Sequence, residues 1–280
     1  MLSAALFGVI GSSALVLGGI LGSYWHPPRW VTGVLLAFAS GTLISALAFE
    51  LFPDAVELAG VAPSAGGLFV GAATFVVINA WLDSRVAAGA GDPGEVAAPE
   101  RAAESLAGAE AKQTEKLEHA ADGTRPGGPS GSAVGFALLA AVTLDGVPEN
   151  TALGVSLLAN AEAGITAGSI ALLFAIFASN FPEALVGAVA MRAADRSPGF
   201  AIGIWSAAAL LLTAAVIVGY GLLSGVDETA LGFALAFAGG AVLASLADTL
   251  MPEAFERGRP ASALATAVGF LISFVLAEGL

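Results

Sequence analysis

The sequence contains no cysteine and only two histidines among its 280 residues. The absence of cysteine excludes disulfides, thiolate metal sites and thiol catalysis. The histidines, His26 and His119, lie in a turn and in a polar stretch, where solvated side chains are expected. An intramembrane metalloprotease would need a motif such as H-E-x-x-H within an apolar segment, and none is present. We therefore expect no enzyme activity and no bound cofactor.

Charge is scarce and mostly acidic, with 10 basic against 23 acidic residues and a net charge of −13. This balance argues against nucleic acid as a partner. Hydrophobic residues make up 57% of the chain, well above the range of soluble proteins, and 36 glycines suit close helix packing in lipid. The composition indicates a membrane protein whose partner is the lipid bilayer.

Windows of about 20 apolar residues predict an all-α polytopic membrane protein with eight transmembrane helices. The first window lacks a basic leader and a cleavage site, so we expect it to remain as a helix. Gly, Pro and charged clusters separate the windows. The expected spans are residues 3–24, 32–52, 66–84, 132–159, 164–191, 199–224, 229–252 and 261–280.

The spans fall into two groups, residues 1–84 with helices 1–3 and residues 132–280 with helices 4–8. Between them, residues 85–131 are rich in Ala, Gly, Glu and Pro and have almost no aromatic residues. Such a stretch cannot bury enough apolar surface to fold alone. We expect it to be a disordered cytoplasmic linker.

The basic residues predict the orientation in the cell membrane. If both termini lie outside, every Lys and Arg falls on the inner side, while the outer loops carry acids such as Asp54, Glu162 and Asp227. The inner set is Arg29, Arg85, Arg101, Lys112, Lys116, Arg125, Arg192, Arg196, Arg257 and Arg259. A wrong number of spans would destroy this sorting.

An internal repeat relates residues 33–55 to residues 232–254 at a constant offset of 199. Leu51-Phe52-Pro53-Asp54, for example, corresponds to Leu250-Met251-Pro252-Glu253. In the predicted orientation the two segments run in opposite directions, so helices 1–3 and 6–8 form an inverted repeat around the central pair 4 and 5. Inverted repeats are typical of transporters with a site near the midplane. The alternative is chance similarity between two helices rich in Ala, Gly and Phe.

Two apolar segments carry a proline followed directly by a glutamate, Pro148-Glu149 and Pro182-Glu183. A carboxylate at that depth costs about 2.5–3.5 kcal/mol on insertion scales, so it indicates function. Each proline also frees a carbonyl one turn earlier. Oxygen ligands of this kind suit hard or borderline divalent cations. The expected ligands are Asp145, Glu149, Asn150, Ser179, Asn180 and Glu183. Alternatively, a Pro-Glu pair marks a helix start at the membrane interface.

Two further acids, Glu50 and Asp248, lie near the ends of the repeated segments and shortly before Pro53 and Pro252. They are candidate ligands along an ion pathway. Interfacial acids that contact headgroup water would give the same pattern, and the sequence leaves both readings open.

With these features the chain resembles the ZIP family of divalent metal transporters. The matching features are eight spans with outer termini, a long inner loop after the third span, and consecutive Pro-Glu motifs in spans four and five. The family's His-Asn-x-Pro-Glu-Gly pattern falls on residues 145–150, with Asp145 at the His, Gly146 at the Asn and Asn150 at the final Gly. Its span-seven His-Glu pair falls on Asp248 and Thr249.

The resemblance implies a metal pathway, with a binuclear centre in some members, and residues 179–183 supply its span-five part. The chain departs from the pattern in having no histidine in any span and no acid in span six around Leu212, where some members have one. All-oxygen ligands fit Mn²⁺, Fe²⁺ or Mg²⁺ at least as well as Zn²⁺.

The sequence thus predicts a divalent metal-ion transporter that moves the ion toward the cytoplasm. A metal-sensing membrane protein of the same fold, which no longer transports, is the alternative. A homodimer is left open.

The predicted orientation is tested by single cysteines in this cysteine-free chain. A cysteine at Glu162 or Asp227 should react with an impermeant maleimide in intact cells, whereas one at Asp195 should react only after the cells are opened, because these positions lie in opposite loops. Labelling of Asp195→Cys in intact cells would refute the orientation.

Overall fold

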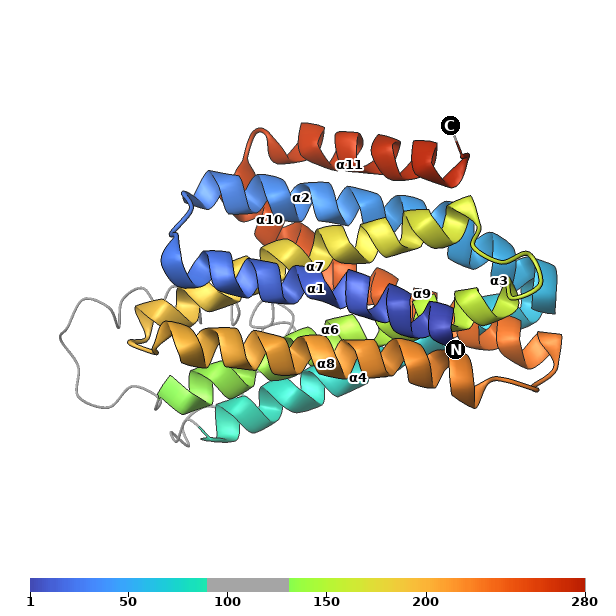
Figure 1. Cartoon of the computed structure of the whole chain (residues 1–280), viewed down its shortest axis with the longest axis horizontal. Coiled ribbons are helices and arrows are strands. Elements are labelled where there is room, and N and C mark those ends of the chain that lie inside the picture. The colour runs from blue at the N-terminus through green and yellow to red at the C-terminus, as the bar shows by residue number, and fades with distance from the viewer. Residues whose placement is uncertain (90–130, 280) are drawn as a thin grey trace, which may run out of the picture.

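The computed structural model describes residues 1–89 and 131–279, with side chains except at 82–83, 85–89, 131–142 and 144–145. Throughout this part of the chain the regular elements are helices, which confirms the all-α expectation. They lie side by side in an elongated bundle, with both chain ends at the same end (Figure 1). The elements are α1 (Leu2–Tyr24), α2 (Arg29–Ala46), the π-helical turn η1 (Leu47–Leu51), α3 (Phe52–Ala59), α4 (Val61–Gly89), α6 (Gly131–Ala159), α7 (Ala167–Ala193), α8 (Pro198–Leu222), α9 (Glu228–Ser245), the π-helical turn η2 (Leu246–Leu250), α10 (Met251–Gly258) and α11 (Ser262–Ala277).

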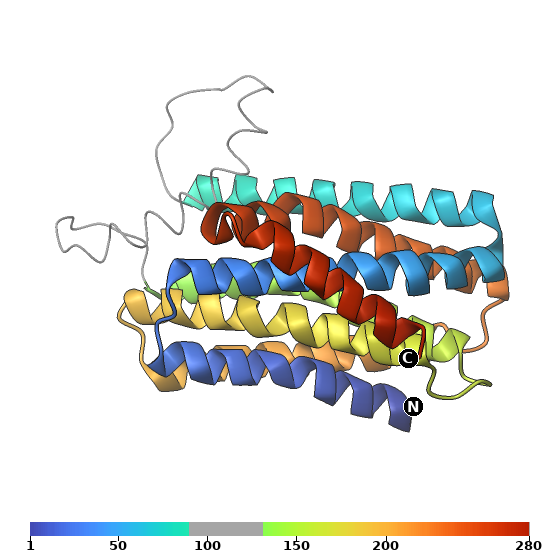
Figure 2. The same ribbon diagram turned by 90° about the horizontal axis from the view of Figure 1, so that it is seen from above.

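Six helical stretches of the described chain are long and apolar enough to cross a membrane. They are Leu2–Tyr24, Arg29–Ala59, Val61–Trp81, Ala167–Ala193, Pro198–Leu222 and Glu228–Gly258. The expected last span is realised as α11, which has only 16 residues and lies obliquely across its neighbours (Figure 2). The expected fourth span falls on α6, where many side chains lie outside the described set. These helices indicate a membrane protein, and the count of eight spans stays a prediction.

The expected linker lies mostly outside the described residues, which stop at 89 and resume at 131. Its first five residues differ from expectation, because α4 continues through Arg85 to Gly89. The predicted end at residue 84 was set by a fall in hydropathy, whereas a helix needs only its backbone hydrogen bonds to continue.

Pro53 and Pro252 do not break their helices, contrary to the expected span ends at 52 and 252. The chain stays helical from Arg29 to Ala59 and from Glu228 to Gly258. A π-helical turn precedes each proline, η1 before Pro53 and η2 before Pro252. A proline lacks the N–H that closes an α-turn, and the wider π-turn accommodates this missing donor.

The two interrupted helices have the same internal division. The bounds of α2, η1 and α3 become those of α9, η2 and α10 when 199 is added to each residue number. Their neighbours correspond as well, since α4 packs on α9 and α11 packs on α2. The offset that relates the sequence segments therefore also relates their breaks and packing partners.

Helix starts and ends follow local sequence signals. Thr166, Ser197 and Asp227 each cap a helix by accepting a hydrogen bond from the backbone N–H three residues later. Gly60 lies at a helix C-terminus with a φ of 79°, a left-handed conformation that favours glycine.

Glycines set the distance between helices. A Cβ on Gly41 of α2 would overlap the Thr266 carbonyl oxygen of α11, and one on Gly240 of α9 would overlap the Leu68 carbonyl oxygen of α4. Gly41 and Gly240 are themselves 199 residues apart. Similar contacts place α1 against α7, where Gly18 faces the backbone. Small residues let backbones approach where lipid gives no hydrophobic driving force between helices.

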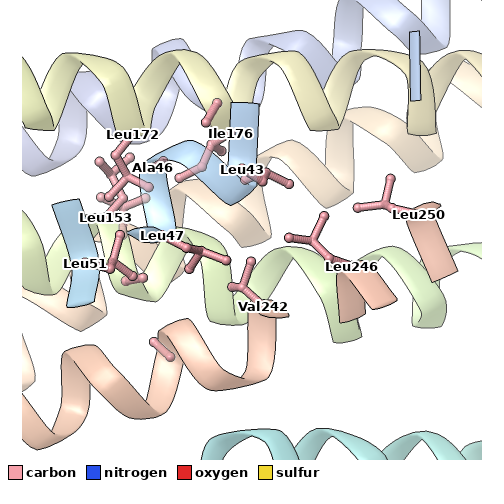
Figure 3. Packing of buried hydrophobic residues seen from close by; sticks show 14 of the residues in the cluster. Leu43, Ala46, Leu47, Leu51, Leu153, Leu172, Ile176, Val242, Leu246 and Leu250 are labelled. Atoms are coloured by element: carbon pink, nitrogen blue, oxygen red, sulfur yellow. The ribbon is translucent and has the colours of Figure 1, made fainter. Parts of the chain in front are cut away.

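A buried apolar cluster fills the middle of the bundle between the two interrupted helices (Figure 3). Leucines 43, 47 and 51 from α2 and η1 meet Val242, Leu246 and Leu250 from α9 and η2, again at an offset of 199. Leu153 of α6 and Leu172 and Ile176 of α7 complete it (Figure 3). The cluster thus adjoins the two helices that carry the Pro-Glu motifs.

The backbone contact at Gly41 can be tested against a matched glycine. Gly41→Ala should lower the free energy of unfolding by about 1–3 kcal/mol, because the added methyl group forces α11 away. Gly203→Ala in α8 should cause no loss, since nothing lies within 4 Å of a Cβ there. Denaturation of both variants in detergent, followed by circular dichroism, measures the difference, and equal stabilities would contradict the close contact.

Candidate functional site

Helices α6 and α7 carry the two Pro-Glu motifs as uninterrupted helices of 29 and 27 residues. Pro148 and Pro182 lie inside them and not at a start, so neither motif is the interfacial helix start considered as an alternative. Asn180 is the central residue of α7, and a helical rise of 1.5 Å per residue puts it about 20 Å from either end. The polar residues of α7 therefore lie near the middle of the bundle.

Glu149 and Ser179 form the one contact between the two motifs that the described hydrogen bonds contain. Glu149 is only 4% exposed, and Ser179 Oγ donates to Glu149 Oε2 over 3.1 Å. The same hydroxyl lies 3.0 Å from the Ile176 carbonyl oxygen, so two acceptors share one proton. Burial of a carboxylate is costly unless charge or hydrogen bonds compensate it.

The two asparagines next to this pair are completely buried, and each uses only its amide nitrogen. Asn150 Nδ2 donates to the Gly146 carbonyl oxygen within α6 over 2.8 Å. Asn180 Nδ2 donates across to the Gly11 carbonyl oxygen of α1 over 3.3 Å. Both Oδ1 atoms are buried without a hydrogen-bond partner in the described structure. Each oxygen can accept a bond that a cation or a water molecule would supply.

Two further predicted ligands flank the pair. Glu183 lies one helical turn beyond Ser179 on α7 and is half-buried. Asp145 lies one turn before Glu149 on α6, and its side chain is outside the described set. The structure thus brings Glu149 and Ser179 together directly, with Asn150, Asn180 and Glu183 beside them in the chain.

On the α8 side the site is closed by an apolar contact. Gly146 of α6 and Leu212 of α8 meet there. A Cβ on Gly146 would lie 2.6 Å from Leu212 Cδ1, and Leu212 is fully buried. The leucine side chain therefore fills the room beside the glycine, and this side of the site is apolar.

Glu50 does not reach this centre. Its carboxylate lies against Gly168 in the first turn of α7, where a Cβ on Gly168 would overlap Oε2. Gly168 is 11 residues from Ser179, which corresponds to about 17 Å along the helix. One turn after Glu50, Asp54 Oδ2 accepts from Asn160 Nδ2 over 3.0 Å. These groups form an acidic surface at the end of the bundle that holds the two termini.

Asp248 lies toward the opposite end and also outside the centre. It is exposed on η2, and its Oδ2 accepts a hydrogen bond of 2.7 Å from Asn79 Nδ2 of α4. Asn79 and Asn160 were missed in the sequence analysis, although an amide within or beside an apolar segment is itself a signal. A role of Glu50 and Asp248 along an ion pathway stays a prediction.

Among the described side chains, no three His, Cys, Asp or Glu residues gather as they do in a tightly bound metal site. What the structure offers at the centre is one buried carboxylate, a hydroxyl and two unsatisfied amide oxygens. One carboxylate together with neutral hydroxyl and amide oxygens can bind a hard cation weakly enough for the ion to dissociate again. Comparison of the chain with protein-family models and with curated proteins finds no match.

The unsatisfied amide oxygens can be tested by comparing the thermal stability of the metal-free protein with the stabilisation that a bound metal ion causes. Asn180→Leu should change the melting temperature of the metal-free protein little or raise it, because a buried amide with an unpaired oxygen is replaced by an apolar group of similar size. The same variant should lose most of any melting-temperature increase that Mn²⁺ causes in the wild type.

Ser273→Ala is the matched control, since Ser273 Oγ on α11 is also buried and unpaired. It should keep the full response to Mn²⁺. A strong loss of metal-free stability in Asn180→Leu would show that its amide serves only the packing of α1 on α7.

Proposed function

We propose that this protein carries a divalent metal ion across the membrane through the oxygen-lined site between α6 and α7. The observation that carries the proposal is Glu149, buried at 4% exposure and bonded to Ser179, beside two buried amide oxygens that lack partners. A cation at this position would compensate the desolvated carboxylate and satisfy the amide oxygens together.

The donor atoms define the class of ion. Every polar atom described around Glu149 is an oxygen or an amide, and neither nitrogen of an imidazole nor sulfur of a thiol is present there. Oxygen ligands favour hard or borderline divalent cations, so Mn²⁺, Mg²⁺ and Fe²⁺ fit at least as well as Zn²⁺. The Gly146–Leu212 contact removes ligands on the α8 side, which favours one bound ion over a binuclear centre.

The repeated architecture favours a transporter over a metal-sensing protein that binds the ion without moving it. We infer that α1 to α4 and α8 to α11 are two copies of one unit, inverted around the pair α6 and α7, as in the ZIP family that the sequence resembles. The common offset of 199 in bounds, glycine contacts and core leucines supports this reading. Inverted repeats let a site near the midplane face either side in turn.

The apolar cluster would then be the barrier on one flank of the site. Leu47, Leu246 and their neighbours pack against one another as an apolar layer between the two interrupted helices. An ion at Glu149 could not cross this layer, because a desolvated charge is costly in apolar surroundings. Release toward the cytoplasm, with Glu50 and Asp248 along the route, would require the helices around the cluster to separate.

Reconstitution into liposomes tests the proposal. Glu149→Gln and Glu183→Gln keep side-chain shape but remove one charge each, and each should weaken Mn²⁺ affinity at least about thirtyfold, from the roughly 2 kcal/mol or more that a buried charge partner contributes. Uptake of Mn²⁺ by the vesicles and binding by isothermal titration are measured in parallel. Glu57→Gln and Glu228→Gln, at the bundle end far from the pair, should behave as the wild type.

The outcomes separate the candidate functions. Wild-type uptake by both glutamine variants would refute the site. Binding that depends on Glu149, without uptake by the wild type, would instead indicate the metal-sensing alternative. Asp145→His, which restores the residue of the ZIP pattern, should shift the preference from Mn²⁺ toward Zn²⁺ because imidazole favours zinc.

A further inference from the structure

Ser245 ends α9, directly before the π-helical turn η2, and its hydroxyl group has no hydrogen-bond partner although the residue is only 2% exposed. A serine inside a helix can donate to the carbonyl oxygen four residues earlier, as Ser40 of α2 does to Leu36 over 2.9 Å. Ser245 does not use this local acceptor. A buried hydroxyl without a partner costs free energy, so its presence calls for an explanation outside α9 itself.

The neighbours of α9 show which way Ser245 points. Gly240 faces the backbone of α4, and Gly239 faces side chains of η1 and the start of α3. At about 100° per residue, Ser245 is turned about 140° from Gly240 and about 120° from Gly239, away from both contacts. Among the helices that pack on α9, this leaves α6. Because Ser245 is buried, it faces α6, the helix that carries Glu149.

The position of Ser245 along α6 follows from the packing at the bundle end that holds the termini. There, Val155 of α6 and Leu235 of α9 belong to one buried cluster. The two helices run in opposite directions, since α6 finishes at this end and α9 begins there (Figure 1). Ser245 follows Leu235 by ten residues, or about 15 Å, and Asp145 precedes Val155 by the same number. Ser245 therefore lies level with the turn of α6 that runs from Asp145 to Glu149.

The residue 199 positions before Ser245 shows that packing does not require this hydroxyl group. That residue is Ala46. Ala46 belongs to the apolar cluster that also contains Leu172 and Ile176 of α7, the helix with the other Pro-Glu motif (Figure 3). An alanine thus fits where α2 meets α7, whereas α9 carries a buried oxygen at the corresponding place.

We propose that Ser245 is a further ligand of the metal ion, and that its hydroxyl oxygen binds the ion from α9. The inference rests on the proposed metal site at Glu149. A hydroxyl suits this position, because it adds an oxygen for a hard cation without adding a charge that would slow release of the ion. The ion then joins α6 to the interrupted helix that contains η2, so binding and release of the ion act directly on α9.

Binding of Mn²⁺ to the full-length protein in detergent, measured by isothermal titration, tests this ligand. Ser245→Ala should weaken Mn²⁺ binding about tenfold, the loss expected for one contact between a neutral oxygen and a charge. The melting temperature of the metal-free variant should stay the same or rise, since the lost hydroxyl has no partner.

Ser45→Ala is the matched control for this titration. Ser45 Oγ is also buried and unpaired. Ser45 lies one turn after Gly41, however, and therefore on the face of α2 toward α11. Ser45→Ala should bind Mn²⁺ as the wild type does.

A thiol at the same position gives a second, spectroscopic test in this cysteine-free chain. Ser245→Cys should bind Cd²⁺ with the ultraviolet charge-transfer absorption of a cadmium–thiolate bond, because thiolates prefer soft ions. Ser45→Cys should show no such absorption. Adding Glu149→Gln to Ser245→Cys should weaken Cd²⁺ binding, because the two side chains bind one ion.

Wild-type Mn²⁺ affinity in Ser245→Ala, an equal loss in Ser45→Ala, or absence of the cadmium–thiolate absorption in Ser245→Cys would each overturn the inference. If Glu149→Gln weakens Mn²⁺ binding while Ser245→Ala does not, the metal site stands and only the ligand on α9 is refuted. If the wild type binds no Mn²⁺, the proposed function and this inference fail together.

Discussion

Backbone-to-backbone contact at glycine is the constraint on which the rest of this structure depends. Helices surrounded by lipid gain little from hiding apolar side chains against each other, so their association relies on close fit and on the few polar bonds between them. Gly18 brings α1 onto the site helix α7, and Gly41 and Gly240 hold α11 and α4 against the interrupted helices. The contact at Gly18 positions α7, and Ser179 of that helix bonds Glu149 of α6.

The same close packing explains how polar groups are tolerated in the middle of the bundle. The carboxylate of Glu149 has a hydroxyl partner, and the amide groups of Asn150 and Asn180 bond backbone carbonyl oxygens. In the two asparagines, the atom left unsatisfied is the acceptor oxygen Oδ1. A site with more acceptors than donors is suited to a positive ion. Buried acceptors without partners cost free energy, and here they lie beside Glu149, where a bound cation would satisfy them.

Much of the fold could be predicted from the sequence, because apolar runs and capping residues are local signals, and the similarity at an offset of 199 can be read directly from the residues. The all-helical class, most helix positions and the offset of 199 follow from such signals. The π-turns before Pro53 and Pro252 could not be predicted, since a proline in an apolar run normally indicates a break and only the surrounding packing decides otherwise. The length of α11 was overestimated because hydropathy does not mark where a helix ends.

For the candidate site, the sequence pointed to Glu149 and Ser179, which bond in the structure, but not to the directions of the side chains. Spacing along a helix places Ser179 and Glu183 on one face, yet it cannot show that Ser179 faces α6 while Asn180 faces α1. Nor can it show that Glu50 and Asp248 lie away from the Glu149–Ser179 pair, because their positions depend on the axial offset between neighbouring helices. The pairing of Gly146 with Leu212 was likewise visible only as two separate departures from a pattern.

The equal length of the two interrupted helices has a consequence for how this chain can change. One inserted residue in an α-helix turns everything beyond it by about 100° and advances it by 1.5 Å. In either 31-residue stretch this would carry the glycines away from their partners and rotate the core leucines toward lipid. Many positions 199 residues apart carry different side chains within equal helix bounds, so these helices accept changes of residue type, whereas a change of length should be accepted only in the connections between helices.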